Sequence, residues 1–202
     1  MTKWMLPILV WTAACNDTTN PEDVEEGELI TTVELTFTPV GGTNDIVAIW
    51  SDPELDGDPE IDQLELESGV DYSLSIRFFD DASSPREDIT LEIEDEAEEH
   101  QVFLTGDAVS GPATATDGPV ALSHTYADED ANGLPVGLVH DVSAVDVLCG
   151  DLEVTLRHLP EEAGAAVKVA GLAETVATSG FSGIPGDTDV QVTFEVCTVA
   201  LD

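Results

Sequence analysis

Apolar and polar residues alternate along most of the chain after residue 28, in short runs that end at Gly, Pro, Asn or Asp. Alternation with a period of two is typical of strands with one buried face, and frequent turn residues are typical of all-β domains. Residues Glu94–Glu99 are compatible with one helical turn, and Ala163–Ser179 with either a loose strand pair or a long loop. The runs predicted as strands are Leu29–Thr38, Asp45–Ser51, Ile61–Glu67, Val70–Phe79, Asp88–Glu94, His100–Thr105, Pro119–Ala127, Val136–Val145, Asp151–Leu159 and Asp189–Val199.

Ten strands are enough for two packed sheets, and helical periodicity is nearly absent. We therefore expect residues 29–202 to form one all-β domain, an antiparallel β-sandwich of the immunoglobulin-like or a related kind.

The first fourteen residues have the layout of a signal peptide. Lys3 precedes a short apolar run from Trp4 to Trp11, and small residues lead up to Cys15. The run is too short to span a bilayer, and small residues directly before a cysteine resemble the lipobox of bacterial lipoproteins. We expect a lipid on Cys15, an acidic tether over residues 15–28, and a bacterial envelope location facing the periplasm or the cell surface. The alternative is an ordinary secretory signal that is cleaved near Ala14.

The chain is strongly acidic, with 43 Asp and Glu against 5 Lys and Arg and a formal charge of -38. This charge repels phosphate backbones, so nucleic acid is excluded as a partner. Hydrophobic residues still make up 42% of the chain, which indicates an acidic shell around a folded core and not disorder.

Two cysteines remain after the expected lipid attachment site, Cys149 and Cys197. An even number of thiols in an exported protein predicts a disulfide between them. Two free buried thiols are the alternative.

Each of the four histidines lies on the same alternating face as the apolar residues of its strand. If the strands follow one another antiparallel, all four gather at one end of a sheet, beside Asp128. Neutral imidazoles with a carboxylate suit Zn²⁺ or Cu²⁺, so the sequence predicts a transition-metal site. The alternative is that each histidine lies at a core edge and forms local hydrogen bonds. The four are His100, His124, His140 and His158.

The stretch from Asp128 to Gly133 reads D-x-D-x-N-G, which matches the start of an EF-hand calcium loop. Val139 stands where the closing bidentate Glu belongs, and an Asn-Gly turn between strands explains the same residues. The acidic stretch Asp52–Glu60 also has the composition of a solvated turn. Ca²⁺ is therefore a weaker candidate than Zn²⁺ or Cu²⁺.

The sequence contains no Gly-rich phosphate loop, nucleophile elbow or HExxH motif. We therefore expect a binding module and not an enzyme, with capture of a metal ion or small ligand at the histidine-bearing end as the leading function. The alternative is a structural or adhesion-type surface lipoprotein that binds another envelope protein and no small molecule.

Five segments together resemble a poorly characterised family of small acidic bacterial lipoproteins, over nearly the whole mature chain. The family is often assigned to the type 1 periplasmic-binding fold, which implies parallel strands alternating with long helices. The residue pattern here offers hardly one helical segment, so the β-sandwich is the fold we predict. The segments are ITTVELTFTPVGGT, EDITLEIEDEAEEHQVF, YADEDANGLPVGL, LEVTLRH and GDTDVQVTFEV.

Overall fold

A computed structural model describes residues 28–200 of the chain. The expected signal peptide, Cys15 and all of the expected tether except Glu28 lie outside these residues. The described part contains twelve strands, two α-helices and one short 3₁₀ helix. Their bounds are β1 Thr32–Pro39, β2 Ile46–Ser51, β3 Glu60–Ile61, β4 Leu64–Glu67, β5 Asp71–Asp80, β6 Glu87–Asp88, α1 Thr90–Asp95, β7 His100–Thr105, β8 Val109–Ser110, β9 Leu122–Tyr126, β10 Val139–Ala144, β11 Cys149–His158, α2 Leu172–Ser179, η1 Phe181–Gly183 and β12 Asp187–Val199.

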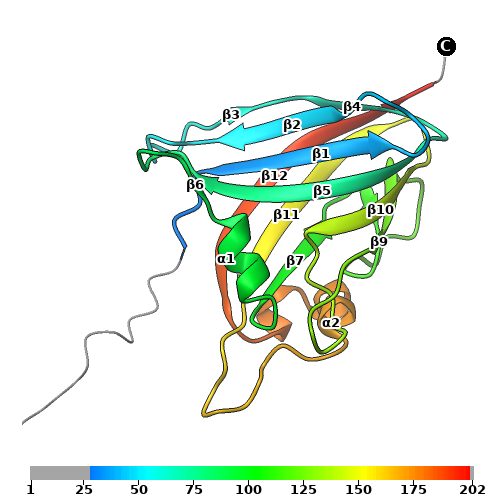
Figure 1. Ribbon diagram of the computed structural model, residues 1–202. Coiled ribbons are helices and arrows are strands. Elements are labelled where there is room, and N and C mark those ends of the chain that lie inside the picture. Colours follow the sequence, from blue (N-terminus) through cyan, green and yellow to red (C-terminus); the bar gives the residue numbers. More distant parts are fainter. Residues whose placement is uncertain (1–27, 201–202) are drawn as a thin grey trace, which may run out of the picture.

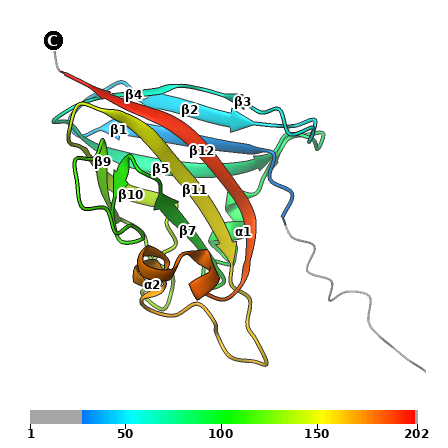
Figure 2. The same cartoon turned by 180° about the vertical axis from the view of Figure 1, so that it is seen from behind.

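The strands form two curled sheets that face each other (Figures 1 and 2). The larger sheet has the order β3-β2-β1-β5-β10-β9-β8, with β6 paired to β5, and the smaller sheet has the order β4-β12-β11-β7. The all-β, sandwich-like fold is therefore confirmed. The expectation of purely antiparallel sheets was wrong, because β12 pairs with β4 and β8 pairs with β9 in parallel.

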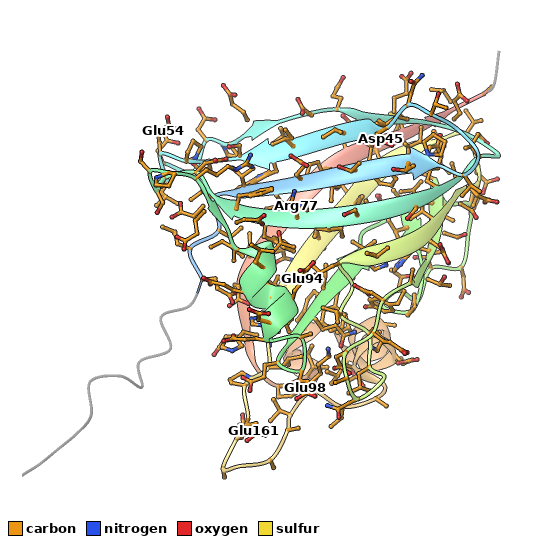
Figure 3. The ribbon with its side chains drawn as sticks, in the orientation of Figure 1. Asp45, Glu54, Arg77, Glu94, Glu98 and Glu161 are labelled. Carbon is orange, nitrogen blue, oxygen red and sulfur yellow. A yellow bond between two sulfur atoms is a disulfide. The ribbon has the colours of Figure 1, made fainter. Side chains whose placement is uncertain are left out.

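Strict alternation of side chains builds the core between the sheets. On β1, Val33, Leu35 and Phe37 are fully buried, and each is paired with a buried residue of β5. Strands β11 and β12 of the smaller sheet supply the opposite wall with Leu152, Val154, Leu156, Val192, Phe194 and Val196. The outward positions carry much of the acidic charge, and Glu54 and Glu161 project from opposite extremities of the molecule (Figure 3).

A second, smaller core lies on the other face of β7. Phe103 points away from the main core and packs with Leu172, Ala173 and Val176 of α2. Strand β7 is therefore buried on both faces. Among residues 28–200, no helix is long and apolar enough to cross a membrane.

Two segments differ from the predicted elements. Residues Asp88–Glu94 were predicted as a strand, but α1 occupies most of them; Ile89 and Ile93 are buried while Leu91 is exposed, which is helical spacing and not alternation. The predicted strand Ile61–Glu67 is divided between β3 in one sheet and β4 in the other. The uncertain span Ala163–Ser179 contains α2.

The predicted disulfide is confirmed. Cys149 on β11 is the register partner of Cys197 on β12, and their sulfur atoms are bonded with Cα atoms 4.1 Å apart. The bond joins the two long central strands of the smaller sheet.

Candidate metal site

The structure brings the four histidines together as two pairs, not as one cluster. His100 of β7 is the register partner of His158 of β11, and their rings stack with centroids 4.7 Å apart. His124 of β9 and His140 of β10 lie in the larger sheet, with ring centroids 4.9 Å apart. The prediction of one four-strand succession was wrong, because β7 and β11 belong to one sheet and β9 and β10 to the other.

His100 is fully buried, and one of its ring nitrogens faces a carboxylate. Its Nδ1 lies 3.2 Å from the carbonyl oxygen of Glu96. A carbonyl oxygen only accepts, so Nδ1 carries the proton and Nε2 of the neutral ring keeps its lone pair. Nε2 is buried without a hydrogen-bond partner in the described structure, and it lies 3.2 Å from Oε1 of Glu28.

Two carboxylates from distant parts of the chain meet this nitrogen. Ligand atoms of Glu28, His100 and Asp189 all lie within 4.8 Å of one another. Oε2 of Glu28 and Oδ2 of Asp189 are also buried without a hydrogen-bond partner in residues 28–200. Three unpaired polar atoms in one buried place are unusual, because burying such a group costs about 1–3 kcal/mol unless it is paired.

A β-bulge brings Asp189 to this place. Along β12, Val190 pairs with Leu156, but the next pair of the ladder joins Thr188 to Arg157, so Asp189 is the extra, unpaired residue. Bulges often re-aim a side chain beside a functional site. Here the bulge turns an acidic side chain toward His100.

The crowded charges shift the pKa values of this group. Burial raises the pKa of Asp189 to about 6, and the negative charge of Glu28 acts in the same direction. Burial alone would lower the pKa of His100, but contact with the Glu28 carboxylate reverses this, and the pKa lies above its usual value. His100, His158 and Arg157 act against the raised pKa of Asp189 but offset it only in part.

A second set of donors shares His100. Ligand atoms of Glu96, His100 and His158 also lie within 4.8 Å of one another. Nε2 of the half-buried His158 lies 3.8 Å from Oε2 of Glu99. The two histidines can therefore offer nitrogen ligands, with the carboxylates of Glu96 and Glu99 nearby.

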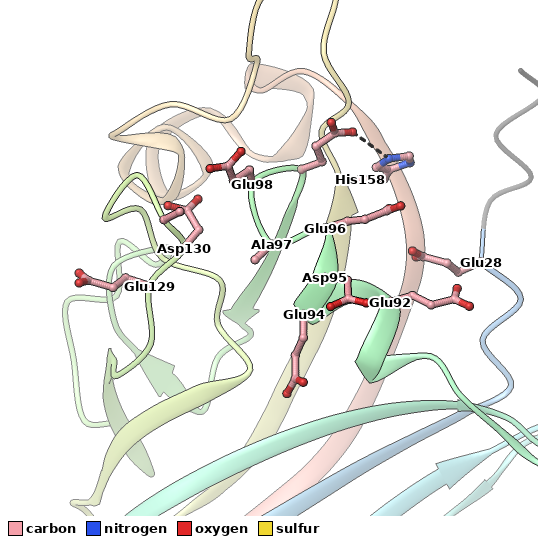
Figure 4. Close-up of a pocket in the computed structure, with 12 residues that line it drawn as sticks. Glu28, Glu92, Glu94, Asp95, Glu96, Ala97, Glu98, Glu129, Asp130 and His158 are labelled. Carbon is pink, nitrogen blue, oxygen red and sulfur yellow. Dashed lines mark ion pairs between the residues drawn. The ribbon is translucent and has the colours of Figure 1, made fainter.

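An acidic pocket of about 780 Å³ opens beside these residues (Figure 4). Nine of its twelve lining residues carry carboxylates, and Glu28, Glu96 and His158 lie together on one side of it. A concave surface with one sign of charge raises the local concentration of ions of the opposite sign. The pocket therefore attracts cations to the donor groups.

In the other histidine pair, hydrogen bonds occupy both ring nitrogens of His140, whereas Nε2 of His124 is buried without a hydrogen-bond partner in the described structure. Nε2 of His140 lies 2.9 Å from the carbonyl oxygen of Gly137, so it carries the proton and Nδ1 accepts. His124 then donates from its Nδ1 to Nδ1 of His140, 3.1 Å away. Burial lowers the pKa of His140 to about 4; burial, followed by the proximity of His140, lowers that of His124 to about 3. Neither ring joins a metal-donor group in the described residues.

Asp128 is likewise occupied by the backbone. Its two oxygens accept hydrogen bonds from the amides of Gly137, Leu138 and Val139 at 2.7 to 3.0 Å, which shapes the approach to β10. This carboxylate therefore organises a loop, and it lies in neither donor group of residues 28–200.

The calcium-like loop holds a lysine in place of an ion. Nζ of Lys168 lies 2.8 Å from Oδ2 of Asp130 and donates to the carbonyl oxygen of Ala97 at 2.6 Å. Both charged side chains are almost completely buried. Oδ1 of Asp130 accepts from the amides of Asn132 and Leu134, so the Asn-Gly turn accounts for the motif.

Sequence reasoning missed Glu28, Glu96 and Asp189. Glu28 stands in a polar stretch that was expected to be a tether, and Asp189 is one of many outward-alternating acids. Only the bulge and the docking of residue 28 single them out, and neither leaves a signal in the sequence.

Comparison of the chain with protein-family models, with curated proteins and with solved structures finds no match in any of the three.

Proposed function

We propose that this protein is a lipid-anchored binding module of the bacterial envelope that captures a transition-metal ion at His100. One observation carries the proposal: the buried Nε2 of His100 has no hydrogen-bond partner and faces a carboxylate, with a second unpaired carboxylate beside it. The bound ion is Zn²⁺ or Cu²⁺, because imidazole nitrogen with carboxylate oxygen suits these metals, whereas Ca²⁺ prefers oxygen alone.

The distance between the facing ligand atoms supports zinc. Nε2 of His100 and Oε1 of Glu28 are 3.2 Å apart. With an ion at the usual 2.0 to 2.2 Å from both atoms, the angle between the two ligands at the ion would be about 100°. Tetrahedral coordination needs about 109°, so movements of a few tenths of an ångström complete the pair. Asp189, His158 and Glu96 are the other members of the two donor groups that contain His100.

Calorimetric titration of the purified protein with Zn²⁺ tests this function. We expect one site in the wild type and at least about a tenfold loss of affinity in His100→Ala. The matched control is His124→Phe, which removes a buried histidine outside the site and should bind normally. Circular dichroism checks the fold, and His158→Gln, at a position that is 17% exposed, replaces His100→Ala if the latter does not fold. Equal binding by the wild type and both site variants would refute the proposal.

The lipid anchor rests on the residues before Cys15 and on the resemblance to acidic bacterial lipoproteins. We expect Cys15→Ser to move the protein from the membrane fraction to the soluble fraction of the cell. Unchanged membrane attachment would reject the anchor without affecting the metal test.

A further inference from the structure

Glu28 belongs to the segment that enters the domain, not to the sandwich itself. It precedes β1 by four residues, and Ile30, two residues after it, is already buried in the main core. The amide of Thr31 then donates a hydrogen bond to the carbonyl oxygen of Phe79 at 3.0 Å. Leu29, between Glu28 and Ile30, is about half exposed. The carboxylate of Glu28 nevertheless reaches into the protein and is only 12% exposed.

This carboxylate docks where negative charge is already dense. Asp189 is one of the donors beside it, and Glu92 and Glu96 line the pocket on the same side (Figure 4). The described structure gives Oε2 of Glu28 no hydrogen-bond partner to offset its burial. Without a cation, this docking brings like charges together in a place largely shielded from water, which is unfavourable.

A metal ion reverses the sign of that interaction. Bound between His100, Asp189 and Glu28, it would join β7, the bulge of β12 and the entering segment through one centre. An ion with ligands from separate elements adds a link between those elements while it is bound.

We propose that metal binding clamps the N-terminal entry segment, residues 28 and 29, onto the end of the smaller sheet through Glu28. The clamp rests on the proposed metal-binding function and adds a conformational consequence to it. The segment is held in place with metal and released to local fluctuation without it. The ion thereby sets how firmly the domain is joined to the part of the chain that precedes it.

Hydrogen exchange combined with zinc titration of the full chain tests the clamp. In the wild type, saturating Zn²⁺ should slow amide exchange in a peptide ending at Thr31 by at least tenfold. Glu28→Gln should lose at least about tenfold in zinc affinity, the smallest effect expected for a ligand, and should show no slowing. The matched control, Glu92→Gln, removes the same charge from the same pocket at a residue outside both donor groups, and should behave as the wild type within about twofold.

The outcomes separate the two proposals. If His100 is required for zinc binding but Glu28→Gln matches Glu92→Gln and the wild-type exchange is unchanged, the clamp is refuted and metal capture stands. If zinc binding does not depend on His100, the metal-capture function is refuted and the clamp with it.

Discussion

Acidification tests the burial of the second histidine pair. His124 and His140 are nearly or fully buried, and burial depresses their pKa values to about 3 and about 4. In the unfolded chain both return to about 6.5. Between pH 4 and 6.5 the unfolded state therefore binds more protons than the folded state.

The sign and size of the effect follow from this difference. A histidine with a depressed pKa contributes its full stabilising free energy above pH 6.5. This contribution is lost as the pH falls toward the pKa that the histidine has in the folded state. Each histidine lowers the free energy of unfolding by about 1.4 kcal/mol per pH unit below 6.5. The loss at pH 5 is therefore about 2 kcal/mol for one histidine and about 4 kcal/mol for the pair. The raised pKa values of Asp189 and His100 act in the opposite direction, so the total profile is a sum of both.

A variant isolates the pair from these other groups. His124→Leu combined with His140→Gln removes both titrations, and glutamine can still donate to the carbonyl oxygen of Gly137. Urea unfolding at pH 7.5 and pH 5 should show a loss larger by about 4 kcal/mol in the wild type than in the double variant. If the double variant does not fold, His124→Leu alone should remove about half of the difference. Equal losses in wild type and variant would refute the argument that both rings stay neutral.

Three further predictions concern the stability of the fold. Lys168→Met leaves the buried Asp130 without a cation and should lower the free energy of unfolding in urea by about 3–5 kcal/mol. Adding Asp130→Asn should restore much of this loss. Equal stability of all three proteins would show that the ion pair is unimportant. Replacing Cys149 and Cys197 by serine opens a loop of 48 residues and should lower the free energy of unfolding by about 4 kcal/mol. An unchanged midpoint in urea would contradict this value. Raising NaCl from 0.05 to 1 M shortens the Debye length from about 14 to about 3 Å, so the melting temperature should rise in a protein of charge -38, and a flat or falling curve would reject charge repulsion as a major term.

Much of the fold follows from local alternation, and the exceptions have identifiable causes. Val33, Leu35 and Phe37 alternate over a long run, so the strand and its buried face could be predicted. Ile89, Leu91 and Ile93 alternate over too few residues to separate a strand from a helix, and packing under β5 selected the helix.

The pairing of strands could not be predicted from the sequence. Alternation along each strand correctly predicted that His100, His124 and His140 are buried. Alternation shows which face of a strand a residue occupies, but not which sheet the strand joins. The division of the histidines into two pairs depends on which strands are neighbours. That is a non-local property, decided by how both sheets bury their apolar faces together.

The bulge at Asp189 also bears on how the proposed metal site could be lost or gained in evolution. Deleting this single residue would let the ladder between β11 and β12 continue without interruption and would remove the carboxylate from the end of the sheet. Val190 is the first residue of β12 in the main core, so the packing of the core would not change. A one-residue gap at this position in a related protein would therefore mark a chain that keeps the architecture and lacks the proposed metal ligand. The number of residues at one strand end would distinguish two kinds of descendant.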